Sequence, residues 1–202
     1  MRRVLIATTN PDKLAEIREL LAEIPVQLLS LRDFPRIPEP EETGQTFEEN
    51  ARLKALYYAT RLAGTPADAL MTVAEDSGLV IDALNGEPGV LSARFLRPDA
   101  SYPERFAEID RRLAALPDRA RTARFVCALA VVSEGNVIYE TVGVVEGEVA
   151  PAPRGDHGFG YDPIFFYPPY GCTLAEVAST EKLRVAHRGH AFRRLAVWLR
   201  TK

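Results

Sequence analysis

The sequence predicts an α/β protein built on a mixed central β-sheet flanked by helices. Strand-like and helix-like segments alternate in the first half of the chain, and two adjacent strands with a turn signal follow later. The 202 residues are 47% hydrophobic and 26% charged, which is typical of a soluble globular protein. This composition excludes a disordered, collagen-like or coiled-coil chain, and we expect a single domain over residues 1–202.

Local patterns predict each element in turn. Short apolar runs rich in β-branched residues predict strands over 3–7, 26–31, 70–74, 79–83, 123–133, 137–145 and 164–167. Apolar residues at helical spacing predict helices over 12–24, 46–63, 101–116 and from 179 to the C-terminus. Pro11 suits a first helical position, and Thr46 with Glu49 has capping-box spacing. The segment 134–136 predicts a hairpin turn, and 34–44 predicts an irregular, proline-rich loop.

Charge and cysteine content narrow the class of protein further. The net charge of -3 argues against a dedicated nucleic-acid binder, and no apolar run approaches the ~18 residues of a membrane span. Cys127 lies in an apolar run, so we expect a buried free thiol there, and Cys172 completes no CxxC motif. These features predict a cytoplasmic protein in a reducing environment. Of the 25 basic residues only four are lysines, so the position of each lysine is informative.

A polar turn follows the first predicted strand and opens the first predicted helix. A helix N-terminus favours anions, and hydroxyl, amide and ammonium groups at the same turn suit a polyphosphate. The residues concerned are Thr8, Thr9, Asn10, Pro11, Asp12 and Lys13. The Walker A pattern is absent. The alternative is ordinary helix capping beside a surface lysine.

Two acidic segments are candidates for metal binding and water activation. Glu75 and Asp76 follow a predicted strand, where carboxylates can hold Mg²⁺ or activate a water, and Ser77 comes next. The alternative is a tight turn that uses Asp and Gly for backbone reasons. Glu41 and Glu42 lie in the proline-rich loop, which is a solvated acidic loop unless it folds toward Asp76.

The C-terminal third holds candidates for recognising a base. Phe159 and Tyr161 offer flat apolar faces beside Gly160, and Asp162 offers hydrogen bonds, unless the loop is structural and its aromatic rings enter the core. Lys182 and Arg188 can bind phosphate or a carbonyl oxygen. His187 and His190 are spaced so that they could ligate a metal, with a solvated helix end as the alternative.

Together and in this order, the motifs resemble the inosine/xanthosine triphosphate pyrophosphatases, the RdgB-like enzymes that remove non-canonical purine nucleotides. The family patterns are found as TxNxxK at 8–13, EETGxTFxENAxxKA at 41–55, DSGLxxDxLxGxPGxxSAR at 76–94, GFGYDPIF at 158–165 and EKxxxxHRG at 181–189. Two positions depart from the family: Glu75 replaces an aspartate, and Ala186 replaces a serine, which removes one hydrogen bond at the base pocket.

The resemblance implies an ITPase-like fold of two lobes with an active-site cleft between them, and a homodimer. It implies hydrolysis of ITP, dITP, XTP and dXTP to the monophosphate and pyrophosphate. Asp76 and Lys13 would be catalytic, and Glu41 and Asp76 would hold Mg²⁺. Residues 8–13 would grip the triphosphate. The other substrate contacts would come from Ser77, Phe159, Gly160, Tyr161, Asp162, Lys182, His187 and Arg188.

Three alternative functions remain to be weighed. A Maf-like pyrophosphatase would act on pyrimidine or ordinary nucleoside triphosphates. A catalytically inactive nucleotide sensor would bind ITP without releasing pyrophosphate, which the intact Asp76 and the acidic loop argue against. A nucleic-acid-binding module is disfavoured by the net charge.

Overall fold

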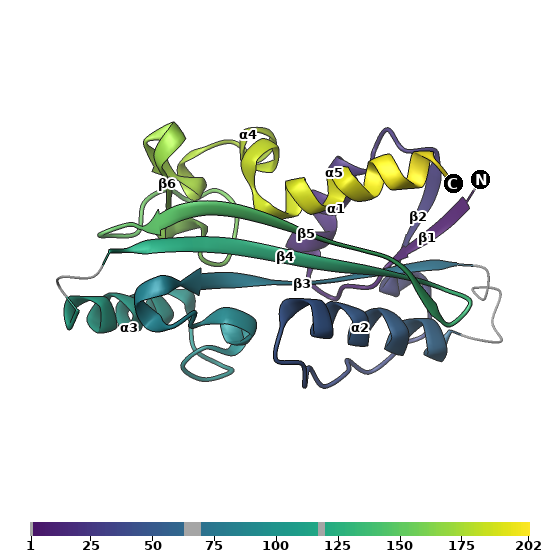
Figure 1. Cartoon of the computed structure of the whole chain (residues 1–202), viewed down its shortest axis with the longest axis horizontal. Helices are drawn as coiled ribbons and strands as arrows, with labels where there is room; N and C mark the ends of the chain where they lie inside the picture. The colour runs from purple at the N-terminus through teal and green to yellow at the C-terminus, as the bar shows by residue number, and fades with distance from the viewer. Residues whose placement is uncertain (1, 63–69, 117–119) are drawn as a thin grey trace. The chain divides into compact units, whose positions relative to one another are not determined.

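The computed structural model describes residues 2–62, 70–116 and 120–202. In this described part, seven strands form one sheet in the order β2-β1-β3-β4-β5-β6-β7 (Figure 1). β1 runs parallel to β2 and β3, whereas β6 pairs antiparallel with β5 and β7, so the sheet is mixed as predicted. The strands are β1 Arg2–Ile6, β2 Val26–Ser30, β3 Met71–Ile81, β4 Thr122–Ser133, β5 Asn136–Val149, β6 Phe165–Tyr167 and β7 Cys172–Thr173. The α-helices are α1 Pro11–Leu20, α2 Phe47–Arg61, α3 Tyr102–Ala114, α4 Ser179–Val185 and α5 His187–Arg200.

The chain divides into two compact units. Unit 1 comprises residues 1–76, 127–143 and 188–202, and unit 2 comprises 77–126 and 144–187. The α/β class with flanking helices is confirmed. The single domain over 1–202 and the cleft between lobes stay predictions.

Unit 1 contains the N-terminal strands, and helices cover both of its sheet faces (Figure 1). On one face α1 and α5 pack on the strands, and the core there includes Ile6, Ile17, Val73, Cys127, Leu129, Phe192 and Leu195. α2 covers the other face and begins with the predicted capping box, in which Thr46 and Glu49 exchange hydrogen bonds. The predicted hairpin at 134–136 is present, and positive φ at Glu134 and Gly135 gives it the geometry of a two-residue turn.

Unit 2 has a separate hydrophobic core around α3. This helix has Ser101 as its N-cap and starts with Tyr102 and Pro103. Its apolar side packs in a cluster that includes Leu79, Ile81, Phe106, Ile109, Phe125, Ile164, Phe165 and Leu174. Because this core combines residues of β3, α3, β4, β5 and the segment 161–174, it fixes that C-terminal segment against these elements.

The prediction of two strands at 70–74 and 79–83 is wrong, because β3 is continuous from Met71 to Ile81. The tetrapeptide from Glu75 to Gly78 is polar, which made it look like a turn. The side chains of Glu75 and Asp76 have partners from other elements, so the strand continues through them. The two carboxylates therefore lie in the middle of a strand and not at its end.

The prediction of one C-terminal helix from residue 179 is also wrong. α4 ends at Val185 and α5 begins at His187, with Ala186 extended between them at φ -70° and ψ 154°. The expected first helix over 12–24 is shorter, since α1 ends at Leu20. The expected end of the second helix at Ala63 lies outside the described residues.

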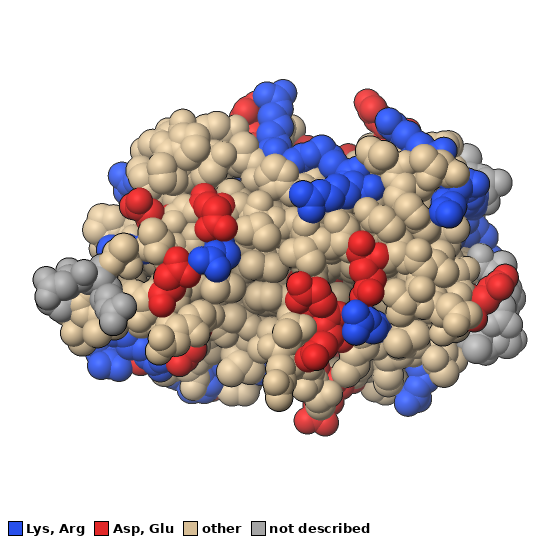
Figure 2. Space-filling model, viewed as in Figure 1, with Lys and Arg blue, Asp and Glu red and all other residues tan. Residues whose placement is uncertain are grey.

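The surface carries interspersed charges of both signs. On the face drawn in Figure 2, acidic and basic side chains lie among one another and neither forms a continuous band. Exposed ion pairs such as Arg111 with Glu108 are of a kind that contributes little to stability. Within the described ranges, we find no helix that is both long and apolar enough to cross a membrane.

Candidate active site

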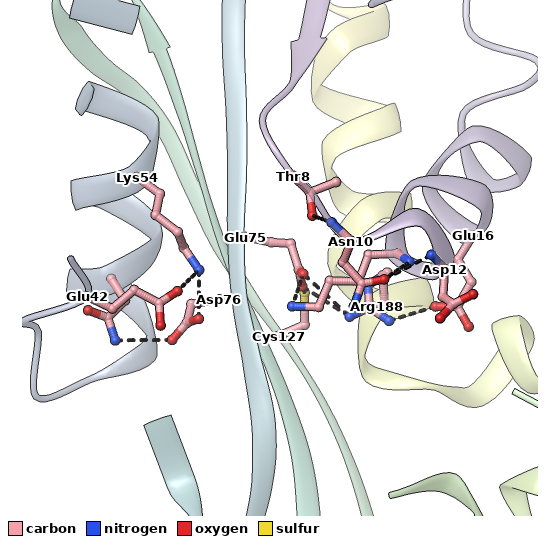
Figure 3. Close-up of polar contacts among 12 residues, drawn as sticks. Thr8, Asn10, Asp12, Glu16, Glu42, Lys54, Glu75, Asp76, Cys127 and Arg188 are labelled. Carbon is pink, nitrogen blue, oxygen red and sulfur yellow. Dashed lines mark hydrogen bonds and ion pairs between the residues drawn. The ribbon is translucent and has the colours of Figure 1, made fainter. Parts of the chain in front are cut away.

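The centre of the candidate site is the pair of adjacent acids on β3. Successive side chains of a strand point to opposite faces of its sheet, so Glu75 and Asp76 face different neighbours. Figure 3 shows Glu75 directed toward α1 and α5, and Asp76 directed toward α2. One strand thus supplies a carboxylate to each of two separate polar clusters.

Glu75 lies in a buried cluster with cations from two helices. Lys13 of α1 places its Nζ 2.6 Å from Glu75 Oε1, and Arg188 of α5 places Nη2 3.3 Å from Oε2. Arg188 also donates from Nη1 to Glu16 Oε2 at 2.6 Å. Burial acts to raise the pKa of Glu75, but the adjacent Arg188 and Lys13 charges outweigh it and hold that pKa well below the usual range.

Cys127 of β4 completes the Glu75 cluster. Its side chain is fully buried, which confirms the predicted free thiol, and its Sγ donates to Glu75 Oε2 at 3.0 Å. Burial and then the Glu75 charge raise the pKa of this thiol well above its usual value. The group is therefore a protonated donor and not a nucleophile.

Asp76 lies in a cluster on the opposite face. Lys54 of α2 places Nζ 2.8 Å from Asp76 Oδ1 and 2.7 Å from Glu42 Oε1. Asn50 donates from Nδ2 to Asp76 Oδ2 at 3.2 Å. Burial raises the pKa of Asp76 above its ordinary value, although Lys54 opposes that shift. A carboxylate in this setting takes up a proton more readily than an exposed aspartate does.

The acidic loop folds toward Asp76, as its candidate role requires. Gly44 donates its backbone N–H to Asn50 Oδ1 at 2.8 Å, and Asn50 in turn contacts Asp76. A side chain at Gly44 would place its Cβ 2.6 Å from Asn50 Oδ1, so the close approach requires glycine. Glu42 is the acid that reaches this cluster, whereas Glu41 is exposed.

The N-terminal turn caps α1. Asn10 accepts hydrogen bonds from the backbone N–H groups of Asp12 and Lys13 at 2.9 and 3.1 Å, and Thr8 Oγ1 accepts from Asn10 N at 3.2 Å. The Asn10 side chain therefore caps the helix, which was the alternative to a role in binding polyphosphate. Lys13 departs from it, because its ammonium is directed to Glu75 and not to solvent. Of the other predicted triphosphate ligands, Thr9 and Asp12 are exposed and Pro11 is the first residue of the helix.

In unit 2 three of the predicted base-reading residues, Phe159, Asp162 and Lys182, form a cluster of their own. The buried Asp162 accepts from Lys182 Nζ at 2.5 Å and from the backbone N–H of Phe159 at 2.9 Å, both on Oδ2. The Lys182 ammonium lies 4.7 Å from the centre of the Phe159 ring. Gly158 has a φ of +71°, and a Cβ there would lie 2.2 Å from Asp162 Oδ2. These contacts hold Phe159, which is half-buried, in a defined orientation.

Two other predicted residues of this group are more buried than a ligand contact suggests. The Tyr161 ring is 4% exposed and packs edge-on against Tyr102, while its hydroxyl donates to the Ser92 carbonyl at 2.8 Å. The alternative of aromatic rings in the core thus describes Tyr161. His187 is buried and stacks on Phe125 with a ring-centre distance of 4.8 Å, so it does not lie at a solvated helix end.

The two remaining predicted contacts have ordinary surroundings. Gly160 has a φ of +67°, and Ser77, which follows Asp76 on β3, is half-buried.

The Asp76 cluster is the part of this site whose chemistry suits a divalent cation. Within the described ranges, no group of three or more His, Cys, Asp or Glu residues could hold a metal. The Asp76 and Glu42 carboxylates nevertheless converge on one cationic group, the Lys54 ammonium. Mg²⁺ is bound by one or two protein carboxylates together with waters and substrate phosphates, so this oxygen donor set fits it.

Sequence reasoning missed several residues of these clusters. Lys54 and Asn50 lie inside the segment 41–55 that carries the acidic motif, and Lys54 is one of the four lysines. That scarcity was a signal for Lys54. Glu16 and Cys127 had no comparable signal. In the sequence, a glutamate on a helix looks like an ordinary surface residue, and a cysteine in an apolar strand looks like an ordinary core residue.

Comparisons with known proteins match this chain to one family over nearly its whole length. The model of the Ham1 family matches residues 4–198. A dITP/XTP pyrophosphatase from Geobacter sulfurreducens is 46% identical over 191 residues, which cover 95% of this chain and 93% of that protein. A dITP/XTP pyrophosphatase from Geobacillus kaustophilus is 44% identical over 195 residues, which cover 96% and 93%. The solved structure of a HAM1 protein from Coxiella burnetii has a TM-score of 0.90 at 40% identity and full coverage of both chains.

Proposed function

The chain belongs to the Ham1 family, and from that premise we propose that it hydrolyses non-canonical purine nucleoside triphosphates. The substrates are ITP, dITP, XTP and dXTP, and the products are the nucleoside monophosphate and pyrophosphate. The single observation that carries the proposal is Asp76. This buried carboxylate has a raised pKa and lies between a lysine and an asparagine, in a chain that matches dITP/XTP pyrophosphatases along its length.

Asp76 would act as the general base. A water that contacts its carboxylate would lose a proton to it while the oxygen attacks phosphorus, and the raised pKa makes Asp76 a better proton acceptor. Asn50 and Lys54 hold the two carboxylate oxygens in place, which fixes the direction of proton transfer. Lys13, at the N-terminal turn of α1, would bind the triphosphate.

We propose Mg²⁺ as the cofactor, held by Asp76 with Glu42 of the acidic loop. The support is the convergence of these two carboxylates on the Lys54 ammonium. Bound there, Mg²⁺ would neutralise phosphate charge as it redistributes in the reaction. Direct metal binding by Glu41 stays a prediction.

Selection of the base would depend on donors aimed at the 6-oxo group of hypoxanthine or xanthine. Adenine carries an amino group at that position, and a buried donor facing it would lose its acceptor at about 1–3 kcal/mol. Arg188 and Lys182 are the cationic candidates, and the half-buried Phe159 ring is the stacking candidate. We also propose that the protein is a homodimer and acts in the cytoplasm, where its free thiols Cys127 and Cys172 remain reduced.

Pyrophosphate release from a nucleotide panel tests the activity. We expect turnover of ITP, dITP and XTP with Mg²⁺ present, little turnover of ATP or dTTP, and loss of turnover when the metal is chelated. A preference for dTTP would instead support the Maf-like alternative, for which the comparisons give no support. Binding of ITP without pyrophosphate release would identify a nucleotide sensor, and tight, salt-sensitive duplex binding would indicate a nucleic-acid module.

A further inference from the structure

The Glu75 carboxylate is the shared partner of two residues that the proposed function assigns to substrate. Lys13, for the triphosphate, and Arg188, for the base, both contact it. We propose that Cys127 is a positioning residue for this reaction, whose thiol fixes the Glu75 carboxylate so that Lys13 and Arg188 are both correctly aimed. This inference rests on the proposed function, because it assigns a role to a residue that would not itself touch the nucleotide.

Each oxygen of Glu75 has one partner of its own, and Arg188 Nη2 contacts both, at 3.5 Å from Oε1 and 3.3 Å from Oε2. Oε1 receives the Lys13 ammonium at 2.6 Å. Oε2 receives the Cys127 thiol at 3.0 Å and the Arg188 guanidinium at 3.3 Å. The Arg188 contact is long for a charged hydrogen bond, so the thiol is the closer donor to Oε2. Without the thiol, the carboxylate can rotate about its terminal bond, and the Lys13 and Arg188 contacts would shift together.

Charge balance explains why a neutral donor suits this position. Glu16 and Glu75 supply two negative charges, and Lys13 and Arg188 supply two positive charges. A further cation at residue 127 would unbalance the buried group, at the cost that an uncompensated buried charge carries. A cysteine adds one hydrogen bond and no charge.

The surroundings of the thiol are apolar on its other side. Cys127 is a member of the unit 1 core together with Val73, Leu129 and Phe192. Cysteine packs as a small hydrophobic residue and still carries a weak S–H donor, so it meets both demands at the boundary between core and site.

The position of Cys127 predicts a particular kinetic signature. Its contact is to Glu75, on the face of β3 opposite the proposed base Asp76 with Lys54 and Asn50. A disturbance of Glu75 should weaken substrate binding through Lys13 and Arg188 and leave proton transfer at Asp76 unchanged. We therefore expect changes in KM and not in kcat.

The test compares Cys127→Val, which removes the donor and keeps the side chain apolar, with Cys127→Ser, which keeps a donor. For ITP with Mg²⁺ we expect Cys127→Val to raise KM about tenfold, as for loss of a hydrogen bond to a charged group, with kcat within about twofold. Cys127→Ser should restore KM to within about twofold of the wild type. Cys172→Val, which changes the half-buried cysteine of unit 2, is the matched control and should leave both constants unchanged.

Several results would overturn the proposal. An unchanged KM in folded Cys127→Val would do so, and so would an equal rise in the Val and Ser variants, which would assign the residue to packing alone. If Cys127→Val does not fold, Cys127→Ala replaces it in the same comparison with Cys127→Ser.

A binding measurement separates this inference from the proposed function. Calorimetric titration of ITP into each variant with the metal chelated requires no turnover. If the wild type releases no pyrophosphate from any nucleotide of the panel, the proposed function fails. The Val and Ser affinities for ITP would then still support the positioning role if they differ about tenfold, or refute it if they are equal.

Discussion

Glu75 and Asp76 are neighbours on one strand, yet their surroundings differ in nearly every respect that matters for chemistry. Glu75 contacts two cations and a thiol, which keep its pKa well below the usual range. Asp76 contacts one lysine that it shares with Glu42, and burial raises its pKa. The alternation of a β-strand is enough to separate the two carboxylates, because it turns adjacent side chains to opposite faces of the sheet.

This difference assigns different tasks to the two acids. A carboxylate held ionised between Lys13 and Arg188 is a fixed anchor for cations and a poor acceptor for a proton. A carboxylate whose pKa is raised toward the working pH can take a proton from water and return it. The sequence offers both acids as candidates for metal binding, and the structure instead directs Glu75 away from the Glu42 carboxylate.

The largest effect is expected from Asp76→Asn. Asparagine keeps the shape of the side chain and cannot accept the proton, so kcat should fall about 10²- to 10⁴-fold, the usual contribution of a general base. ITP binding measured by calorimetry should persist, and circular dichroism should show the native fold. Turnover close to that of the wild type would remove Asp76 from the role of base.

Glu75→Gln should lower the free energy of unfolding, whereas Asp76→Asn should lower kcat. Removing this charge leaves Arg188 and Lys13 with one fewer buried carboxylate, which should lower the free energy of unfolding at pH 7 by about 3–5 kcal/mol. Urea denaturation measures this difference. A loss below about 1 kcal/mol would match an exposed ion pair and would contradict the anchoring role.

The pH dependence of that loss has a definite sign. The folded-state pKa of Glu75 is depressed, so its stabilisation is fully present above the ordinary pKa of 4.5 and is lost as pH falls through the folded value. The gap in unfolding free energy between wild type and Glu75→Gln should therefore narrow below pH 4.5. A gap that widens in acid would contradict the ionised state of Glu75.

Carboxyl titration by NMR in the metal-free protein compares the two acids directly. Asp76 should titrate above its ordinary value of 3.8 and Glu75 below 4.5. Lys54→Met removes a charge that opposes the Asp76 shift, so the pKa of Asp76 should rise further while that of Glu75 stays in place. Equal changes in the pKa values of Asp76 and Glu75 would show that the two clusters are coupled and not separate.

Much of this arrangement could be predicted from local sequence. Capping residues at Asn10 and Thr46 start two helices as expected, and positive φ at Glu134 and Gly135 forms the expected hairpin. The break in β3 was predicted wrongly because a polar tetrapeptide is a turn signal only when its side chains have no partners within the fold. Those partners come from α1, α2, β4 and α5, and no local window contains them.

The residues of the site that were not predicted were missed for the same reason, because their partners are distant in the sequence. Cys127 lies 52 residues from its partner Glu75, and Arg188 lies 172 residues from Glu16. The family resemblance could place Asp76, Lys13 and Arg188 in one functional group. It could not show that Glu75, held by the Cys127 thiol, would connect Lys13 with Arg188, because that depends on which strands become neighbours in the sheet.

The smallest predicted effect concerns the helix that carries Arg188. Ala186 precedes α5 in an extended conformation suited to an N-cap, and it has no side-chain oxygen to accept an N–H of the first turn. Ala186→Ser restores the serine that family resemblance expects here. It should raise the free energy of unfolding by about 1 kcal/mol and Tm by a few degrees, measured calorimetrically.

The matched control for Ala186→Ser is Ala178→Ser, at the corresponding position before α4. Both substitutions cap a helix, but only the one at residue 186 acts on the helix of Arg188. We therefore expect similar gains in stability and a lower KM for ITP in Ala186→Ser alone. Because Ala186 is 1% exposed, a buried hydroxyl there stabilises the protein only if it hydrogen-bonds to an N–H of α5. A fall in Tm would show that this hydrogen bond does not form. The titration of Asp76 on the other face of β3 should be the same in both variants, as two separate clusters require.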